Sequence, residues 1–490
     1  MENRKLKILF VSSEVEGFSK TGGLADAAKS LPIELSKLGH EVKIITPFYR
    51  TINHREHAKH LLDLSFATNS SRQDIPFQVY ELRLDNIPVL TIDNAHYFDR
   101  FGLYGEDHHA YQDNGERFAF FCLAALQTCD ALDFTPDIIH CNDWHTGLIP
   151  FLLKNCYQDH SRFTKTKTVM TTHNACYQGI FDKSQLNLIP EVSSCMDKRV
   201  LENYNYINYL KVGLIYADKI NTVSPNYASE VLTTLGSHGM SDTFMARIHD
   251  FEGILNGCDY SNWDPQKDAL LPANFSADDL QGKTICKEEL QTMLGLTHSK
   301  NPIFGMVCRI TEQKGFAILL PILESFLKHN LQLVIAGSGD PAITGHLTAI
   351  AKHFPEKFKF IDSYNDKLAH MIEAGSDFFL MPSIFEPCGL NQLYSFSYGT
   401  LPIVRAVGGL KDTVIDYDQD PDNANGFVFN DPRPNQLLSL MRRALLLYIE
   451  HPEEMTRIKR QAMRSHFYWS TAAELYNRLY YKALYQLRSW

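Results

Sequence analysis

Two positively charged side chains follow a predicted buried strand over 303–307, in the segment CRITEQKGF. Arg309 and Lys314 lie just past this strand, and Gly315 opens the predicted helix that follows. Two cations beside a helix N-terminus suit a diphosphate group, because each charge-assisted hydrogen bond contributes about 1.5 to 3 kcal/mol. The segment therefore indicates a diphosphate site. The alternative is a solvated loop with a glycine at the helix entry.

A second candidate for phosphate binding is the loop SKTGGLAD, which links a predicted strand over 7–11 to a helix. Gly22 and Gly23 let the backbone approach a ligand, helix N–H groups attract phosphate, and Lys20 adds a positive charge. The loop matches neither common glycine-rich phosphate motif, so an ordinary turn with an exposed lysine fits equally well. Asp26, in the first helical turn, either complements the helix dipole or bonds a neutral hydroxyl group.

Polar residues also follow two further predicted strands, over 137–140 and 168–172. Asp143 comes after the first of these in NDWHTGL, and His173 and Asn174 come after the second in THNACYQG. The carboxyl ends of parallel strands form the binding edge of an open α/β sheet, so these side chains are candidates for one site. A helix N-cap for Asp143 and a buried core position for His173 are the structural alternatives.

The segment FEPCGLNQLY adds a carboxylate and another helix start. Glu386 follows a predicted strand, Gly389 to Asn391 open a helix, and Gly408 and Gly409 repeat this arrangement one strand later. A carboxylate beside a helix start and a phosphate site is expected to be ionised and to bond a sugar hydroxyl. Cys388 is expected to be buried and to contribute its backbone.

Two further features have mainly structural interpretations. Tyr364 lies at a strand end, where its ring can stack on a nucleobase or pack against the protein. The Asp-Tyr-Asp sequence at 416–418 resembles a metal-binding DxD motif, but it shares an acidic loop with Asp420 and Asp422. We interpret it as a solvated turn and expect no metal site.

The elements that must position these residues are short apolar strands alternating with helices, which is typical of parallel sheets with crossover helices. Strands are predicted over 7–11, 42–46, 137–140, 168–172, 219–223, 303–307, 331–336, 358–361, 378–381 and 403–405. Helices are predicted over 115–129, 201–217 and 225–234, and from Pro452 to the end of the chain. The pattern indicates two doubly wound units. Their boundary is expected near or within 257–300, which is rich in Asp, Asn, Pro and Ser and has no strand pattern.

Length and composition agree with two soluble domains. The chain has 490 residues, too many for one ordinary core, with 44% hydrophobic and 21% charged residues. A net charge of −10 argues against a general nucleic-acid or anionic-membrane binder. The ten cysteines include no CxxC pair, and the N-terminal apolar run is too short for a signal peptide. We therefore expect a cytoplasmic protein without bound nucleic acid or membrane contact.

Taken together, these motifs resemble the glycogen and starch synthase family, in particular its bacterial members. The similarity covers nearly the whole chain, in family order: SKTGGLAD, NDWHTGL, THNACYQG, TVSPNYASE, GILNGCDYSNWDP, RITEQKG, FEPCGLNQLY and VGGLKDTV. The resemblance implies a retaining glycosyltransferase of the GT-B fold, with two Rossmann-like α/β domains facing across a cleft. It further implies domains at 1–251 and 252–466, and a C-terminal helix at 467–490 that packs on the N-terminal domain.

The resemblance also implies the reaction and the roles of the site residues. Glucose would pass from ADP-glucose to the 4-hydroxyl of an α-1,4-glucan such as glycogen, without metal or other cofactor. The residues implied to be catalytic are Glu386, His173, Lys314 and Arg309. Those implied to bind substrate are Lys20, Gly22, Gly23, Asp26, Asp143, Asn174, Tyr177, Gln178, Asn256, Tyr364, Cys388, Gly389, Leu390 and Asn391.

The sequence differs from the family pattern at two places, and other classes of protein are alternatives to this family. Asn391 stands where the family usually has Thr, and AAKSLP replaces a more familiar run after KTGGLAD. Because Asn can still hydrogen-bond, we expect altered affinity and retained activity. The rivals are another GT-B enzyme, either a glucan phosphorylase or a trehalose-forming transferase, and a catalytically silent glucan-binding module. ADP rather than UDP follows from the bacterial resemblance alone, and monomer and homo-oligomer stay equally open.

Overall fold

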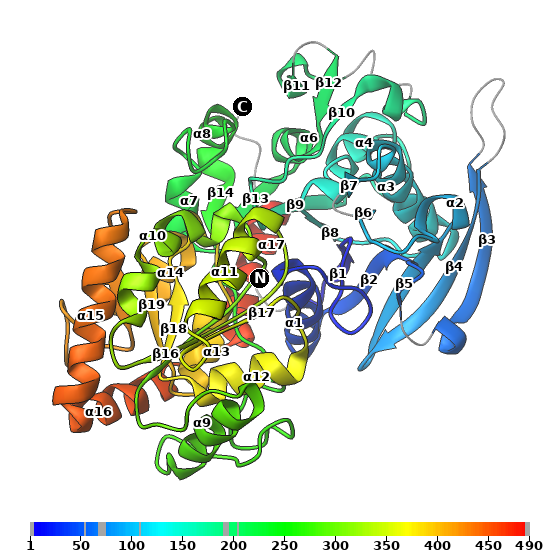
Figure 1. Ribbon diagram of the computed structural model, residues 1–490. Helices are drawn as coiled ribbons and strands as arrows, with labels where there is room; N and C mark the ends of the chain where they lie inside the picture. Colours follow the sequence, from blue (N-terminus) through cyan, green and yellow to red (C-terminus); the bar gives the residue numbers. More distant parts are fainter. Residues whose placement is uncertain are drawn as a thin grey trace. The chain divides into compact units, whose positions relative to one another are not determined.

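The computed structural model describes residues 4–52, 55–66, 75–106, 109–189, 196–202 and 205–485. The chain divides into two compact units. The first unit comprises Met1–Gly257 and Trp469–Trp490, and the second comprises Cys258–Tyr468. Each unit has its own parallel sheet core with helices on both faces (Figure 1).

The first unit is built on a nine-stranded sheet in the order β14-β13-β9-β8-β1-β2-β5-β4-β3. Its strands are β1 Lys7–Val11, β2 Glu41–Pro47, β3 Lys59–Phe66, β4 Ile75–Leu84, β5 Ile87–Asp93, β8 Ile138–Asn142, β9 Lys167–Thr172, β13 Lys219–Thr222 and β14 Phe251–Gly253. The five strands predicted in this half are confirmed, and they pair in parallel. Sequence analysis did not predict β3, β4 or β5, of which β3 and β4 extend the sheet as an antiparallel hairpin.

Helices and two small sheets complete the first unit. The helices are α1 Gly23–Lys37, α2 Ala95–Phe98, α3 Asn114–Ala131, α4 Ile149–Asn155, α6 Tyr209–Tyr216, α7 Pro225–Glu230, α8 Ser241–Ala246 and α17 Trp469–Tyr485. The small sheets contain β6 Gly105–Glu106 with β7 His109–Ala110, and β10 Ile180–Asp182 with β11 Leu201–Glu202 and β12 Tyr206–Asn208.

Two helix predictions in the first unit need correction. The helix predicted over 201–217 begins only at Tyr209, because the preceding described segments form strands β11 and β12. Residues 203 and 204 lie outside the described residues. Asn208 sets the helix start, since its side chain accepts the N–H of Lys211 as an N-cap. The helix predicted over 225–234 ends at Glu230.

The second unit contains a six-stranded parallel sheet in the order β17-β16-β15-β18-β19-β20. Its strands are β15 Ile303–Val307, β16 Gln332–Ala336, β17 Phe358–Ile361, β18 Phe378–Met381, β19 Leu401–Arg405 and β20 Phe427–Phe429. Its helices are α9 Gln281–Leu294, α10 Phe316–Leu327, α11 Pro341–His353, α12 Asp366–Gly375, α13 Asn391–Ser397, α14 Gly408–Thr413, α15 Pro434–Glu450 and α16 Pro452–Met463. The five predicted strands of this half are confirmed, whereas β20 and α9 were not predicted.

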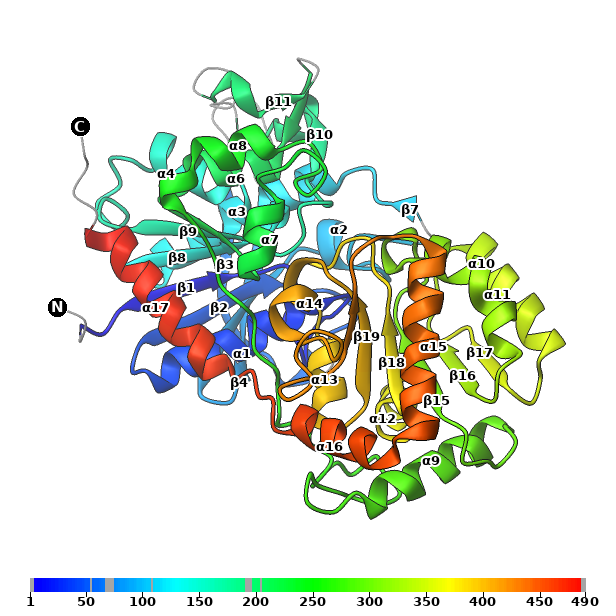
Figure 2. The same cartoon turned by 90° about the vertical axis from the view of Figure 1, so that its left-hand side faces the viewer.

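The C-terminal segment is two helices and not the single one predicted. Helix α16 ends at Met463, and α17 starts at Trp469 after a short break. Helix α17 belongs to the first unit, where it lies beside α1 and contacts β9 and β13 (Figure 2). The side chains that it buries include Trp469, Tyr476, Leu479 and Tyr480. Residues 486–490 lie outside the described residues.

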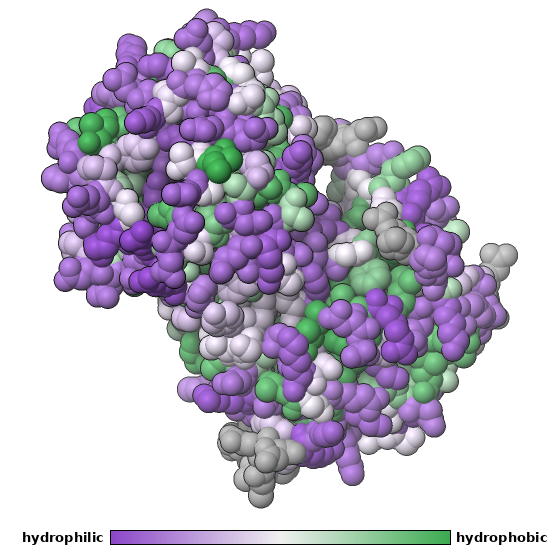
Figure 3. All heavy atoms as spheres, turned by 90° about the horizontal axis from the view of Figure 1, so that it is seen from below, coloured by the Kyte–Doolittle hydropathy of each residue, from purple (hydrophilic) through white to green (hydrophobic). Residues whose placement is uncertain are grey.

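The surface of the molecule is mainly hydrophilic in the view of Figure 3, with hydrophobic side chains gathered in small groups. Among the residues that the structure describes, no helix is long and apolar enough to cross a membrane.

One buried carboxylate joins several elements of the second unit. Asp377 lies just before β18 and accepts hydrogen bonds from Lys287 of α9 at 2.8 Å and Lys459 of α16 at 2.6 Å. It also accepts the N–H of Ile303 at 3.0 Å, which fixes the start of β15. Although burial alone would raise its pKa, Lys459 and Lys287 hold the pKa of Asp377 well below its usual range. This carboxylate therefore anchors the two strands that lead to Lys314 and Glu386.

We predict that Asp377→Asn lowers the free energy of unfolding by about 3 to 5 kcal/mol in urea titrations, because it leaves two buried lysines without their carboxylate. Since the pKa is depressed in the fold, the stabilisation is present above about pH 4 and is lost as the pH falls below it. Asp418→Asn is the control, because Asp418 pairs with Arg443 at the surface. The control is expected to change stability by less than about 1 kcal/mol. Equal losses in both variants would contradict the anchor.

Candidate active site

An ion pair joins two loops at the carboxyl edge of the second sheet. Lys314, which follows β15, donates to Glu386, which follows β18, with an Nζ to Oε2 distance of 2.6 Å. The hydroxyl of Ser383 donates to the same carboxylate oxygen at 3.0 Å. Only 18% of the Lys314 side chain and 9% of the Glu386 side chain are exposed. The structure thus brings two sequence-predicted residues, 72 positions apart, into direct contact.

Glycines allow the loops to approach this closely. Gly315 has a φ of +82°, and a Cβ there would lie 2.0 Å from the carbonyl oxygen of Pro382. Gly408 has a φ of +42°, and a Cβ there would lie 1.9 Å from the carbonyl oxygen of Glu386. A side chain at either position would push the loops apart, so these glycines hold the backbone around Lys314 and Glu386.

The segments that follow β15 and β18 carry most of the other predicted residues of the second unit. Asn391 begins α13, and its side-chain amide donates to the carbonyl of Val307 at 2.6 Å, which ties α13 to the end of β15. Cys388 is buried, as expected, and Gly389 and Leu390 are partly buried. Arg309 is exposed directly after β15.

The aromatic candidate lies two strands away from this pair. Tyr364 follows β17, two strands from β15 in the sheet, and 57% of it is exposed. Its exposed ring agrees better with a stacking surface than with a packed core position.

In the first unit, the SKTGGLAD loop is held by a carboxylate that sequence analysis missed. Glu14, almost fully buried after β1, accepts the N–H of Thr21 at 2.5 Å and its hydroxyl at 2.6 Å. It also accepts the N–H of Gly22 at 3.3 Å and the hydroxyl of Tyr104 at 2.7 Å. Glu14 lies at a strand's carboxyl end, so the rule that selected its neighbours would also have selected it.

This loop carries more negative than positive charge. Lys20 contacts Glu16 at 2.6 Å and Asp26 at 2.9 Å. Burial alone would lower the pKa of Lys20, but Asp26 and Glu16 outweigh it and raise the pKa. Glu14 already accepts the N–H groups of Thr21 and Gly22, so of the loop's backbone donors those at the start of α1, from Gly23, are the ones to consider for a phosphate.

Asp143 and His173 meet at the ends of neighbouring strands β8 and β9. The carboxylate of Asp143 accepts the backbone N–H of His173 at 2.6 Å and makes no capping bond to the short helical turn that it precedes. Asp143 has a φ of +55°, a strained conformation for a side-chain-bearing residue, as is common at functional sites. Burial raises the pKa of Asp143 to about 7, against the lowering effect of the backbone N–H groups that it accepts.

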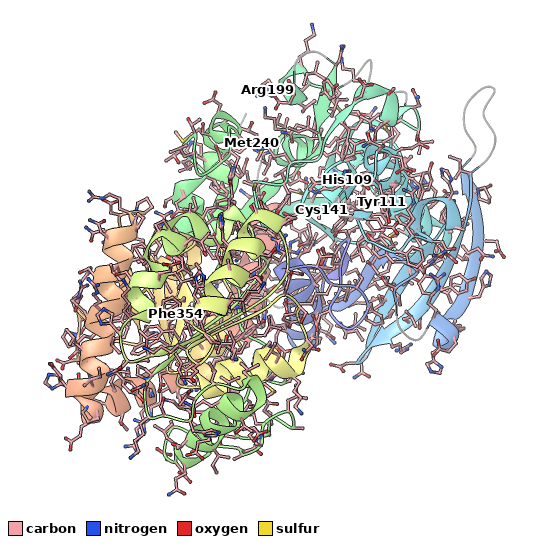
Figure 4. The ribbon with its side chains drawn as sticks, in the orientation of Figure 1. His109, Tyr111, Cys141, Arg199, Met240 and Phe354 are labelled. Atoms are coloured by element: carbon pink, nitrogen blue, oxygen red, sulfur yellow. The ribbon has the colours of Figure 1, made fainter. Side chains whose placement is uncertain are left out.

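His173 is neutral and oriented. Burial lowers the pKa of His173 to about 3. Its Nε2 lies 2.9 Å from the side-chain oxygen of Asn142, whose amide nitrogen donates to the carbonyl of Val11. Nε2 of His173 therefore carries the proton. Cys141, labelled in Figure 4, is fully buried one residue before Asn142 and belongs to the rigid interior of β8.

The loop after His173 presents further candidates. Asn174 accepts the N–H of Cys176 at 3.0 Å, which turns the chain so that Tyr177 is 46% exposed. Gln178 is fixed in place, since it donates to the carbonyl of His238 at 3.0 Å and accepts from Asn208 at 2.6 Å.

Asn256 has a buried acceptor without a protein partner. Only 5% of Asn256 is exposed, and its side-chain oxygen makes no hydrogen bond to any residue that the structure describes. Buried polar atoms are normally paired, so this oxygen can accept a hydrogen bond from a ligand.

Part of the Asp-Tyr-Asp sequence at 416–418 is built into the fold of the second unit. Asp416 is buried and accepts the N–H of Val428 at 2.9 Å, so the interpretation as a fully solvated turn is wrong for this residue. Asp418 pairs with Arg443 at 2.6 Å. Within the described ranges, no group of three or more His, Cys, Asp or Glu residues is arranged to hold a metal ion.

Comparison with known proteins gives matches over nearly the whole chain. Residues 7–246 match the family of starch synthase catalytic domains, and residues 295–462 match the group 1 glycosyl transferases. The glycogen synthase of Aeromonas salmonicida is 53% identical over 98% of this chain and 98% of its own length. The glycogen synthase of Vibrio cholerae is 49% identical over 97% of this chain and 98% of its own length.

Solved structures show the same fold. The catalytic domain of starch synthase IV from Arabidopsis thaliana, bound to ADP and acarbose, is 31% identical and superposes with a TM-score of 0.89, covering 98% of this chain and 100% of that chain. Sucrose-phosphate synthase from Thermosynechococcus elongatus, at 17% identity and a TM-score of 0.60, shares the fold over 98% of this chain and 99% of that chain. The two Rossmann-like units are thus those of a GT-B glycosyltransferase, and the chain belongs to the glycogen and starch synthase family.

Proposed function

We propose that this enzyme transfers glucose from ADP-glucose to the 4-hydroxyl at the non-reducing end of an α-1,4-glucan, with retention of configuration and release of ADP. The observation that carries the proposal is the contact between Lys314 and Glu386, which places a cation and a carboxylate at one sheet edge. The cation suits the diphosphate of the donor, and the carboxylate suits the hydroxyls of its sugar.

The donor diphosphate is assigned to Arg309 and Lys314. Both cations follow β15, and a departing diphosphate develops negative charge that positive groups stabilise. The exposed ring of Tyr364 offers a stacking surface for the base. ADP in the Arabidopsis starch synthase IV structure supports adenine as that base.

The transferred glucose is assigned to Glu386 and the acceptor to the first unit. Because Ser383 and Lys314 hold one oxygen of Glu386, its carboxylate has a fixed direction in which to accept sugar hydroxyls. The acidic SKTGGLAD loop and the unpaired oxygen of Asn256 offer acceptors to further hydroxyls.

The chemistry proposed is displacement on one face of the sugar. The bond from the glucose carbon to the diphosphate oxygen breaks, and the acceptor 4-oxygen forms the new bond on the same face. The departing phosphate oxygen takes the proton of the 4-hydroxyl, and Lys314 and Arg309 stabilise its charge. We assign to the backbone carbonyl of His173 the stabilisation of the electron-poor sugar carbon. No side chain acts as a covalent nucleophile, and no metal or other cofactor takes part.

An assay with ADP-glucose, glycogen and a chelator tests this function, and the expected products are ADP and longer glucan chains. Glu386→Gln and Lys314→Ala are each expected to lower kcat/KM by a factor of about 30 or more, because each removes a contact made in the transition state. Asp418→Asn, a surface change in the same unit, is the control and should keep the wild-type rate. A glucan-binding module would give no ADP, and rates within about threefold of wild type in both variants would overturn the site assignment.

The rate should also depend on the ionisation of Asp143. Since burial raises its pKa to about 7, the carboxyl is protonated below this pH and ionised above it. We expect kcat to rise with pH through about 7, because the carboxylate accepts a stronger hydrogen bond from an acceptor hydroxyl than the protonated acid does. Asp143→Asn should remove this step from the pH–rate profile, whereas Asp182→Asn, at a surface turn, should retain it. A step of equal size in Asp143→Asn would assign it to another group.

A further inference from the structure

The last helix of the first unit contacts the sheet through a chain of buried polar groups. Tyr480 of α17 lies 2.7 Å from Nδ1 of His140 in β8, and Nε2 of His140 lies 2.6 Å from the hydroxyl of Thr171 in β9. Thr171 donates to the side-chain oxygen of Asn221 in β13 at 2.7 Å, and Asn221 donates to the hydroxyl of Tyr476 at 3.0 Å. The chain starts and ends on α17, and all five residues are buried.

With the Asn221 amide oriented as in the structure, one arrangement of protons satisfies every member of this chain. Because Thr171 donates to Asn221, its oxygen must accept the bond from His140, so Nε2 of His140 carries the proton. Nδ1 of His140 is then the acceptor, and Tyr480 must donate to it. The phenol hydroxyl of Tyr480 therefore sets the tautomer of a histidine inside the sheet.

The same strands carry the proposed site at their ends. The carbonyl of Thr171 accepts the N–H of Asp143 at 2.9 Å. The carbonyl of His140 accepts from the side chain of Asn142 at 3.4 Å, and the oxygen of that side chain orients His173. The side chain of His140 thus bonds directly to α17, and that of Thr171 is linked to α17 through His140 and Asn221, whereas the backbone of both residues bonds to the Asp143–His173 region.

We propose that Tyr480 and Tyr476 of α17 are positioning residues for Asp143 and His173. The two tyrosines act through the tautomer of His140 and the hydroxyl of Thr171. This inference rests on the proposed function for its effect on the rate. It adds to that function a second task for the C-terminal helix, beyond covering an apolar face.

Tyr480→Phe tests the proposal against a matched control. Tyr481→Phe also removes one hydrogen bond between α17 and the first unit, from the Tyr481 hydroxyl to the carbonyl of Arg4 at 2.6 Å, but that bond lies outside the polar chain. We expect Tyr480→Phe to lower kcat about tenfold, with KM for ADP-glucose within about twofold of wild type. Tyr481→Phe should keep kcat within about twofold.

A second measurement, nitrogen NMR of the histidine side chains, reports on His140 and His173 without any substrate. In protein labelled with [15N]histidine, wild-type His140 is expected to show a protonated Nε2 and a hydrogen-bonded Nδ1. Tyr480→Phe should shift the Nδ1 signal of His140 and also the signals of His173, whereas Tyr481→Phe should leave both residues unchanged. These spectra stay informative if the protein fails to elongate glucan, so a failure of the proposed function is distinguishable from a failure of this inference.

Equal behaviour of the two variants would overturn the inference, and so would a fall in kcat without any change in the His173 signals. If Tyr480→Phe does not fold, Thr171→Val replaces it, since valine keeps the shape of the side chain and cuts the chain of bonds between His140 and Asn221. The same shift at His173 and the same fall in kcat are expected, and wild-type values for both would contradict the proposal.

Discussion

The contact between Lys314 and Glu386 is the interaction on which the second unit's site depends. It joins the loops after β15 and β18, which are central neighbours in the sheet. Two largely buried charges stay stable only as a pair, since removing one partner leaves the other uncompensated, at a cost of about 3 to 5 kcal/mol. The glycines at 315 and 408 permit this contact, and Asp377 fixes the strands that precede both loops.

The two candidate regions differ in local charge, which the net charge of the whole chain does not reveal. The chain carries −10 overall, yet Arg309 and Lys314 place two cations after a single strand. The SKTGGLAD loop has the opposite balance, because Glu16 and Asp26 pair with its one lysine and Glu14 accepts its backbone N–H groups. The loops at the two sheet edges therefore present opposite charge environments, cationic after β15 in the second unit and acidic after β1 in the first. Lys20 pairs with Glu16 and Asp26, and its assignment to a phosphate stays a prediction.

The sequence predicted ten of the parallel strands, because most of these are short apolar runs buried on both faces, as in Ile303–Val307. It did not predict the hairpin of β3 and β4, since β4 alternates buried and exposed residues and gives a weaker apolar signal. The helix at 201–217 was overextended because Tyr206–Asn208 pairs with β10, a contact that local periodicity does not contain.

The sequence indicated which residues belong to the candidate site better than it indicated which of them contact one another. The carboxyl-edge rule selected Asp143, His173 and Glu386, because that rule depends only on strand direction. Glu14 was missed although the same rule covers it, and its contacts with Thr21, Gly22 and the distant Tyr104 became visible only in the structure. The polar chain from Tyr480 to Tyr476 was also beyond prediction, because it joins residues up to 340 positions apart.

The central claim is that Lys314 serves the diphosphate whereas its partner Glu386 serves the sugar. Calorimetric titration with ADP, which lacks the sugar, separates these roles most directly. The account predicts that Lys314→Ala weakens ADP binding by about tenfold or more, because a charge-assisted bond is lost. Glu386→Gln should bind ADP within about threefold of wild type or more tightly, since Lys314 no longer shares its charge with a carboxylate. Equal weakening in both variants, or unchanged binding in Lys314→Ala, would contradict the account.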